Sequence, residues 1–268
     1  MNRTIVCSLL VLANSVFANG LSAQDAAKSK PKPLKALLVT GGCCHEYAKQ
    51  KDLLKAGIES RAMVEVSHVH SADTSTKAKF AIYDDPNWAN GYDIILHDEC
   101  TSHVVEQPYV DNILNAHKNG VPAVNLHCAM HSYRLPEKDD WFQFVGIQSS
   151  QHDAQKPIEI AFIDREHPIT KPLENWTTVN EELYNNLKLF PTAKPLARGR
   201  QDLGTRVDDY VVVWTNQFGK GRVFSTTLGH NTETVGDPRY LDLVTRGLLW
   251  ATDKLNPEYL QPFAAPKK

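Results

Sequence analysis

Two imidazoles and a thiol follow a short apolar run in the sequence VPAVNLHCAMHSY, residues 121–133. Residues 121–126 predict a buried strand, and His127, Cys128 and His131 come directly after it. In open α/β sheets, ligands bind just outside the carboxyl ends of the strands. The residue types at this position therefore indicate a functional site rather than packing alone.

Three other predicted strands also end in side chains that can do chemistry. If the core strands run parallel, their carboxyl ends share one edge of the sheet. His45, His127 and His230 are then expected to converge on a single cleft. The other strands and the side chains that follow them are residues 34–40 with His45, residues 92–96 with Asp98, and residues 222–228 with His230 and Glu233.

These residue types fit three kinds of chemistry, and the sequence leaves all three open. In a nucleophilic site, Cys128 is the thiolate, His230 the base, and Glu233 the acid that orients the base. In an acid–base site, the imidazoles and a carboxylate move protons on a polyol without a metal. Cys128 also fits the role of a small buried hydrophobe, which is the commoner use of a cysteine.

In the third kind of site, neutral imidazoles and a carboxylate hold a metal ion. The predicted ligands are His45, His127, His230 and Asp98. Such a set suits a divalent ion such as zinc, which polarises a carbonyl or activates water.

Further polar and aromatic residues are candidates for contacts with a substrate. As an alternative to an enzyme, the same cleft can be a non-catalytic sugar-binding module, with Trp88, Trp141, Tyr133 and Trp214 as stacking faces. The candidates for substrate binding are His131, Tyr133, Arg134, Glu182, Tyr184 and Asn231.

The composition is that of an ordinary soluble globular protein. The chain has 268 residues, of which 42% are hydrophobic and 22% charged. This length allows one large α/β domain or two small ones. The formal net charge is −2, so bulk electrostatics do not favour a nucleic-acid or membrane-surface partner.

The first 23 residues have the pattern of a secretory signal peptide: Arg3, then an apolar run at residues 5–17, then small residues. We therefore expect a periplasmic or secreted protein with no stable membrane span after cleavage. Residues 24–33, rich in Lys, Ala and Pro, predict a disordered leader. Residues 34–254 are expected to form one domain, and residues 255–268 a C-terminal tail.

Four cysteines remain after the signal segment, which is enough for two disulfides in an exported protein. However, Cys43 and Cys44 are adjacent, and all four cysteines follow strand-like runs. This favours free or metal-facing thiols over a stabilising framework. The bridge to test first is Cys100–Cys128.

Early strands alternate with helices, which predicts a parallel, doubly wound sheet, and later strands at hairpin spacing predict an antiparallel extension. Asp237 is the expected N-cap of the last helix. Residues 181–184 are expected to begin a short helix or a loop. Helices are predicted at residues 47–61, 107–119, 136–147 and 238–253, and strands at 34–40, 63–70, 92–96, 121–126, 157–163, 195–200, 209–215 and 222–228.

Several segments resemble the ThuA-like (trehalose-utilisation) family over nearly all of residues 34–254. The most specific are GKGRVF at 219–224, LGHNTET at 228–234 and RGLLWA at 246–251, joined by residues 39–45, 126–134 and 181–184. The resemblance implies the class I glutamine amidotransferase-like fold, a flavodoxin-like three-layer sandwich. It also implies a link to disaccharide metabolism, with keto-sugars as suspected substrates and a small carbohydrate as the partner.

Relatives with this fold place a nucleophilic cysteine in a G-x-C-x-G turn and a His-x-Glu pair later in the chain. Cys128 and His230 match the two reactive positions. However, Leu126 and Met130 occupy the glycine positions, and Glu233 is three residues after the histidine. A strained nucleophile turn needs small neighbours. The resemblance therefore implies the cleft more than glutaminase-type acyl transfer, and a Cys–His hydrolase remains an alternative.

Overall fold

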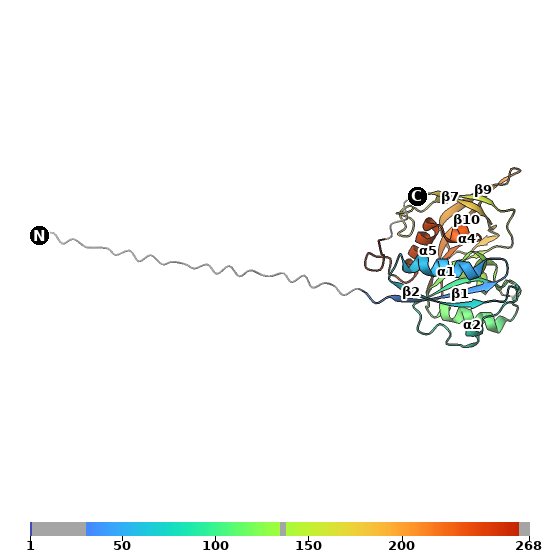
Figure 1. Cartoon of the computed structure of the whole chain (residues 1–268), viewed down its shortest axis with the longest axis horizontal. Coiled ribbons are helices and arrows are strands. Elements are labelled where there is room, and N and C mark those ends of the chain that lie inside the picture. Colours follow the sequence, from blue (N-terminus) through green and yellow to red (C-terminus); the bar gives the residue numbers. More distant parts are fainter. Residues whose placement is uncertain (2–30, 135–137, 263–268) are drawn as a thin grey trace. The chain divides into compact units, whose positions relative to one another are not determined.

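The computed structural model describes Met1 and residues 31–134 and 138–262 (Figure 1). Residues from Pro31 onward form one compact unit. The predicted signal peptide, residues 24–30 of the predicted leader, and residues 263–268 of the predicted tail lie outside the described residues. Where the tail is described, Leu260 pairs with Ala62, beyond the end of the first helix.

A nine-stranded sheet forms the centre of this unit, in the order β2-β1-β3-β4-β11-β10-β9-β6-β7. The first five strands of this order run parallel, and the remaining pairings are antiparallel. This confirms the α/β fold with a mostly parallel core and an antiparallel extension. The bounds are β1 (Leu34–Gly42), β2 (Val64–Ser71), β3 (Ile94–Cys100), β4 (Ala123–Leu126), β6 (Lys156–Phe162), β7 (Trp176–Glu181), β9 (Lys194–Asp202), β10 (Val207–Phe218) and β11 (Gly221–Thr226).

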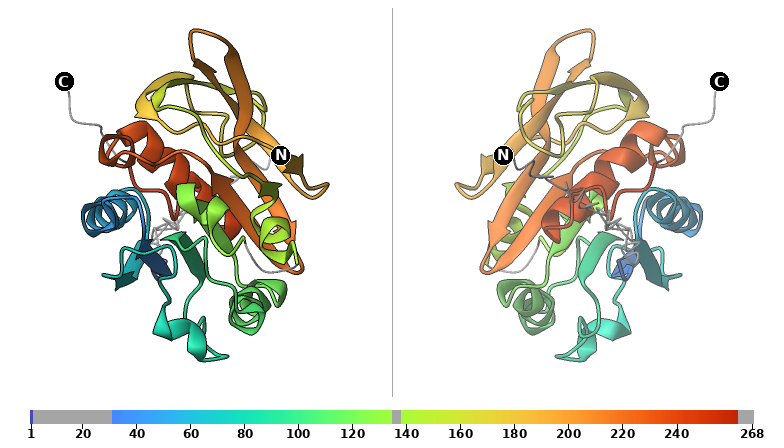
Figure 2. Two further views of the ribbon diagram at one scale, coloured as in Figure 1. Left: turned by 90° about the vertical axis from the view of Figure 1, so that its right-hand side faces the viewer. Right: turned by 90° about the vertical axis from the view of Figure 1, so that its left-hand side faces the viewer.

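Helices cover both faces of the parallel part, which gives the three layers of the predicted sandwich (Figure 2). One face packs against α1 (Tyr47–Glu59) and α5 (Pro238–Ala251) through residues such as Leu38, Ile58 and Val244. The other packs against α2 (Gln107–Lys118) and α3 (Asp140–Val145). The short elements are η1 (Ala81–Asp84), η2 (His127–His131), α4 (Thr232–Val235), and a small sheet of β5 (Ile147–Gln148) and β8 (Lys188–Leu189).

The last helix begins as its sequence predicts. The side chain of Asp237 accepts a hydrogen bond from the backbone N–H of Arg239 at 2.8 Å, and Pro238 occupies the first turn. Leu241, Val244 and Leu248 form its buried stripe. An N-cap of this kind contributes roughly 1 kcal/mol to helix stability.

Two strands differ from the sequence-based expectation. β3 continues to Cys100, four residues beyond the predicted end, because β1 pairs with it as far as Gly42. Asp98 therefore lies inside the sheet and not in a loop beyond it. In addition, a strand ends at Glu181, where we expected a helix or loop to begin. The aromatic and β-branched residues at 176–179, Trp-Thr-Thr-Val, explain this strand, since such residues favour strands.

The ends of β1 and β3 approach each other very closely. Gly42 has a φ of +93°, and a Cβ atom there would lie 2.2 Å from the carbonyl oxygen of Cys100. Only glycine permits both this conformation and this contact. The close approach brings the loop after β1 against the end of β3.

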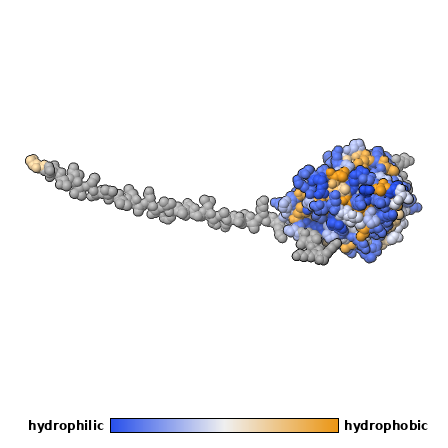
Figure 3. Space-filling model, turned by 90° about the horizontal axis from the view of Figure 1, so that it is seen from above, coloured by the Kyte–Doolittle hydropathy of each residue, from blue (hydrophilic) through white to orange (hydrophobic). Residues whose placement is uncertain are grey.

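The surface of the unit is mainly polar. Hydrophilic residues cover most of the face seen in Figure 3, and apolar residues are scattered among them. The large apolar side chains that are exposed come from different segments and include Val105, Ile163 and Leu187. Scattered exposed residues of this kind are ordinary in soluble proteins and indicate no binding surface by themselves.

Within residues 31–134 and 138–262, no helix has the length and apolar character needed to cross a bilayer.

Candidate functional site

The three imidazoles that the sequence analysis placed together do converge. His45 follows β1, His127 follows β4 and His230 follows β11. The ring centroids are 4.8 Å apart for His45 and His127, 4.7 Å for His45 and His230, and 5.4 Å for His127 and His230. This geometry follows from the parallel strands, whose carboxyl ends lie at one edge of the sheet.

A carboxylate from another part of the chain completes this group. Glu182 comes directly after β7, and its two oxygens lie 3.4 Å from Nε2 of His127 and 3.1 Å from Nδ1 of His230. One nitrogen or oxygen from each of the four side chains lies within 4.8 Å of the other three. We call His45, His127, Glu182 and His230 the His/Glu cluster.

Backbone carbonyls orient two of the imidazoles. Nδ1 of His127 lies 2.6 Å from the carbonyl oxygen of Thr227, and Nδ1 of His45 lies 3.2 Å from that of Cys43. A carbonyl only accepts hydrogen bonds, so each Nδ1 carries the proton when the ring is neutral. Both Nε2 atoms then present a lone pair to the cluster. Nε2 of His127 accepts a hydrogen bond from the hydroxyl of Tyr184 at 3.1 Å, whereas Nε2 of His45 is buried and has no hydrogen-bond partner among the described residues.

The third imidazole is held through its backbone. The buried carboxylate of Glu181 accepts the backbone N–H groups of His230 and Asn231 at 3.0 and 2.9 Å. On the far side of the ring, the amide of Gln155 lies 2.8 Å from Nε2 of His230. The remaining nitrogen, Nδ1, therefore faces Glu182 and the centre of the cluster.

The electrostatics separate two kinds of group within the cluster. Burial, helped by the other two imidazoles, lowers the pKa of His45 to about 2. Burial also opposes protonation of His230, but the hydrogen bond and charge of Glu182 outweigh it and raise the pKa. The pKa of Glu182 is lowered, because hydrogen bonds and charge from His127 and His230 outweigh the cost of burial. At neutral pH the cluster therefore combines a neutral imidazole at His45 with an ionised Glu182, which favours protonation of His230.

Two carboxylates with predicted roles lie away from the cluster. Asp98 is buried and accepts the hydroxyl of Thr40 at 3.1 Å, and burial raises its pKa well above the usual range. It does not belong to the group whose donor atoms converge, so its predicted metal-ligand role is wrong. Glu233 is exposed in the first turn of α4, and Glu182 is the acid that contacts His230.

The cysteines are paired. Disulfides join Cys43 to Cys44 and Cys100 to Cys128, and the Sγ atoms of Cys43 and Cys100 lie 3.5 Å apart. The expectation of free thiols is therefore wrong, and the Cys100–Cys128 bridge is confirmed. Because its sulfur is bonded to Cys100, Cys128 has no thiolate to offer, which contradicts the nucleophilic site.

Some of the candidate substrate contacts lie at the cluster. Tyr184 and Asn231 lie there, and the ring of His131 stacks on Tyr184 with centroids 3.9 Å apart. The side chain of Arg134 instead donates a hydrogen bond to the backbone carbonyl of Ser150.

Other aromatic candidates are part of the core. Tyr133 is 1% exposed, with its hydroxyl directed at Glu99, so its predicted contact with a substrate is wrong. Trp88, Trp141 and Trp214 are at most 4% exposed. None of these four side chains has a free face for stacking on a sugar.

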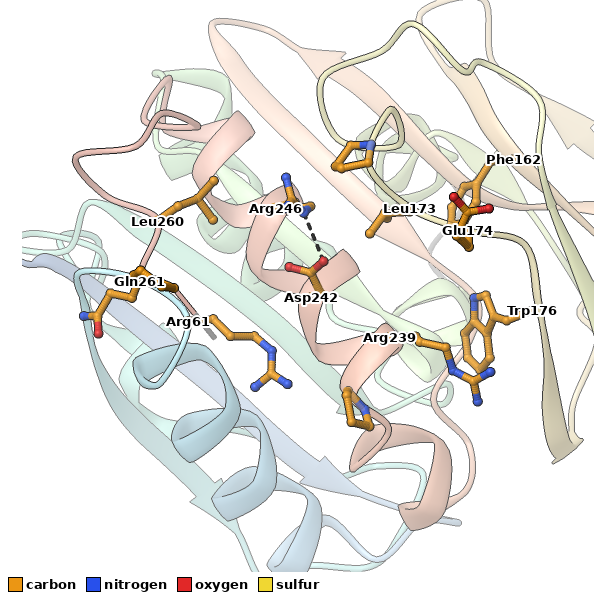
Figure 4. A pocket seen from close by; sticks show the side chains of 13 residues that line it. Arg61, Phe162, Leu173, Glu174, Trp176, Arg239, Asp242, Arg246, Leu260 and Gln261 are labelled. Carbon is orange, nitrogen blue, oxygen red and sulfur yellow. Dashed lines mark hydrogen bonds and ion pairs between the residues drawn. The ribbon is translucent and has the colours of Figure 1, made fainter. Parts of the chain in front are cut away.

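A polar hollow of about 360 Å³ adjoins the cluster. It shares Gln155 and Asn231 with the surroundings of His230, and Glu46 precedes α1 on its other side. A larger cavity of about 500 Å³ lies elsewhere, against α5 (Figure 4). The smaller hollow is lined by Gln155 and Asn231, which adjoin His230, whereas the larger cavity is lined by neither, so we take the smaller hollow as the approach to the site.

Sequence reasoning missed the residues that hold the site in place. Gln155 and Thr227 belong to no motif, and the role of Glu181, like theirs, depends on contacts between distant segments. His152 also contacts the site, with Nε2 3.3 Å from Glu182. The available signal was the run of aromatic and β-branched residues at 176–179, which favours a strand just before the Glu181–Glu182 pair.

Known proteins share this fold. A family model described as ThuA, trehalose utilisation, matches residues 35–251. A ThuA-like protein from Parabacteroides merdae is 19% identical, with a TM-score of 0.64 over 82% of this chain and 90% of that one. A ThuA-like protein from Bacteroides uniformis is 15% identical, with a TM-score of 0.61 over 84% and 94%.

The structure of a GMP synthase component from Thermoplasma acidophilum is 10% identical, with a TM-score of 0.51 over 82% of this chain and 94% of that one. This likeness agrees with the glutamine amidotransferase-like, flavodoxin-like fold. No curated protein sequence matches this chain. The family match, over most of the chain, shows that this protein belongs to the ThuA family.

Proposed function

We propose that this protein is an enzyme of disaccharide metabolism that acts on a sugar or keto-sugar at the His/Glu cluster. The observation that carries the proposal is the convergence of three imidazoles and one carboxylate within one small group. The trehalose-utilisation family supports a sugar as the substrate. We also propose that the protein is exported, on the signal-like pattern of residues 1–23.

General acid–base catalysis needs a base and an acid within reach of the same substrate. His230 is the imidazole suited to proton transfer, because Glu182 raises its pKa, and it can take a proton from the carbon next to a keto group and return one at the carbonyl oxygen. The buried Nε2 of His45 faces the same point and can accept a hydrogen bond from a substrate hydroxyl. Together they support enolisation of a keto-sugar, the step shared by isomerisation and by loss of a neighbouring substituent. Metal-assisted chemistry would use the same residues.

The surroundings also support a polar substrate. The adjoining hollow of about 360 Å³ has a volume suited to a small ligand and is lined by Glu46, Gln155, Asn180, Asn231 and Glu233, among others. Amide and carboxylate side chains of this kind form hydrogen bonds to sugar hydroxyls. Buried Trp and Tyr rings do not contribute, so we expect recognition through hydrogen bonds rather than stacking.

Turnover of keto-disaccharides tests the proposal. The purified protein is incubated with a keto-disaccharide or with the unoxidised parent sugar, and products are followed by NMR. We expect conversion of the keto-sugar and little change in the parent sugar, which has no acidified C–H bond. Binding of either sugar without any product would contradict an enzymatic role and favour a binding module.

A further inference from the structure

We propose that the His/Glu cluster is a binding site for one divalent transition-metal ion, with His45, His127, His230 and Glu182 as the ligands. This inference goes beyond the sugar chemistry proposed above and does not depend on it. It replaces the ligand set expected from the sequence, because Glu182 takes the place of Asp98. It is carried by the positions of the donor atoms, by their orientation and by their chemical type.

The donor atoms have the spacing of a coordination site. Ligands at roughly 2.1 Å from a tetrahedral ion lie about 3.4 Å from one another. The two oxygens of Glu182 are already 3.4 Å from Nε2 of His127 and 3.1 Å from Nδ1 of His230. All four donors lie within 4.8 Å of one another, so movements of about 1 Å by side chains would close them on an ion.

Two buried ring nitrogens in the cluster lack a well-directed hydrogen bond within the described part of the chain. They are Nε2 of His45 and Nδ1 of His230, although Glu182 lies 3.1 Å from the second. Burying an unpaired polar atom costs about 1–3 kcal/mol. A metal ion satisfies both nitrogens at once, which explains why they are directed at the same point.

The outer ring nitrogens have the partners that metal-bound histidines usually have. Such histidines donate the other N–H to a carbonyl or carboxylate, which fixes the tautomer. The carbonyls of Thr227 and Cys43 do this for His127 and His45. In the structure the amide nitrogen of Gln155 faces Nε2 of His230. A half-turn of the amide places its oxygen there, and this oxygen then accepts the N–H of His230.

The ligand types of the cluster suit a divalent transition metal. Imidazole nitrogens with one carboxylate oxygen favour zinc, cobalt, nickel or iron over magnesium or calcium, which prefer oxygen ligands. A bound ion would polarise the carbonyl of a substrate that enters from the adjoining hollow.

Metal binding by the full chain tests this site. Protein freed of metal by a chelator is titrated with zinc and with cobalt(II), by calorimetry and by the visible absorption of cobalt. We expect one ion per chain and a cobalt spectrum that reports nitrogen and oxygen ligands. Glu182→Gln and His230→Ala should each weaken binding by roughly 100-fold or more, since loss of partners beyond the ligands alone costs 10–100-fold. His68→Ala, an exposed histidine on β2, is the matched control and should bind as the wild type does.

Circular dichroism establishes that the variants fold, and His230 is only partly buried, so its replacement is the milder test. Absence of stoichiometric binding, or equal binding by wild type and both variants, would overturn the proposal. Binding that survives in these variants but is lost in Cys44→Ser would also overturn it, because the ion would then be at the cysteines. Failure of sugar turnover leaves these binding measurements unaffected, so the two proposals are tested separately.

Discussion

The Nε2 atom of His127 lies 3.4 Å from Oε2 of Glu182. The histidine comes from the parallel core, directly after β4, and the glutamate comes from the antiparallel extension, directly after β7. The site is therefore built where the two halves of the sheet meet. Glu182 contacts His230 as well, so one carboxylate connects two imidazoles and sets their charge.

Replacing this carboxylate should change the titration of His230. In Glu182→Gln, burial still opposes protonation but the carboxylate no longer favours it, so the pKa of His230 should fall to its usual value or below. An NMR titration of the ring protons measures this change. Glu233→Gln, at the exposed glutamate expected from the sequence, is the control and should leave the titration as it is. An unchanged pKa in Glu182→Gln would mean that the carboxylate does not govern His230.

The parallel half of the site was predictable from the sequence. His45, His127 and His230 each follow a strand with a clear apolar pattern, and parallel strands end at one edge. The antiparallel half was harder to predict. Glu182 follows an edge strand whose alternation is only partly apolar, and its partners are distant in sequence.

The wrong predictions for Asp98 and for the cysteines also have physical explanations. Asp98 was misassigned because β3 continues beyond its apolar core, and side chains alternate between the two faces of a strand. The pairing of Cys43 with Cys44 could not be read from spacing, because it depends on a positive φ of 83° at Cys44. Local pattern predicts where strands end, whereas bonds between neighbouring loops depend on the fold.

Glu181 should act as a positioning residue for His230. Its carboxylate accepts two backbone N–H groups in a buried place, and hydrogen bonds to a charged group contribute about 1.5–3 kcal/mol each. Glu181→Gln keeps the volume but weakens these bonds, so the free energy of unfolding should fall by about 2 kcal/mol in urea. Any measured activity or metal affinity should fall with it. Wild-type stability in this variant would show that the loop is held by other contacts.

Acid should destabilise the protein through its buried neutral histidines. Burial and the neighbouring His97 lower the pKa of His117 to about 3, and the side chain is fully buried. Below pH 6.5, His117 binds a proton in the unfolded chain but stays neutral in the folded chain. The free energy of unfolding therefore falls as the pH falls towards 3. Between about pH 6.5 and about pH 5 this one group should cost about 2 kcal/mol. Urea unfolding at several pH values measures the slope, and His117→Gln should make it shallower. An identical slope in the variant would exclude this histidine as the cause.

The disulfides predict a specific labelling result. Protein unfolded without reductant should show no alkylation at Cys43, Cys44, Cys100 or Cys128, as judged by peptide mass mapping. Cys100→Ser opens a loop with a sequence separation of 28 and should lower the free energy of unfolding by about 3 kcal/mol. Stoichiometric alkylation of Cys128 in the oxidised protein would contradict the pairing and restore the nucleophilic hypothesis.

Turnover of a keto-disaccharide by the His127→Ala, His230→Ala double variant tests the central claim most directly. These two side chains both contact Glu182, so the double variant removes two of the three imidazoles and both imidazole partners of the carboxylate. With wild type and His68→Ala as references, we predict that the folded double variant loses nearly all turnover while both references convert the sugar. Activity equal to that of the wild type in the double variant would contradict the assignment of this cluster as the active site.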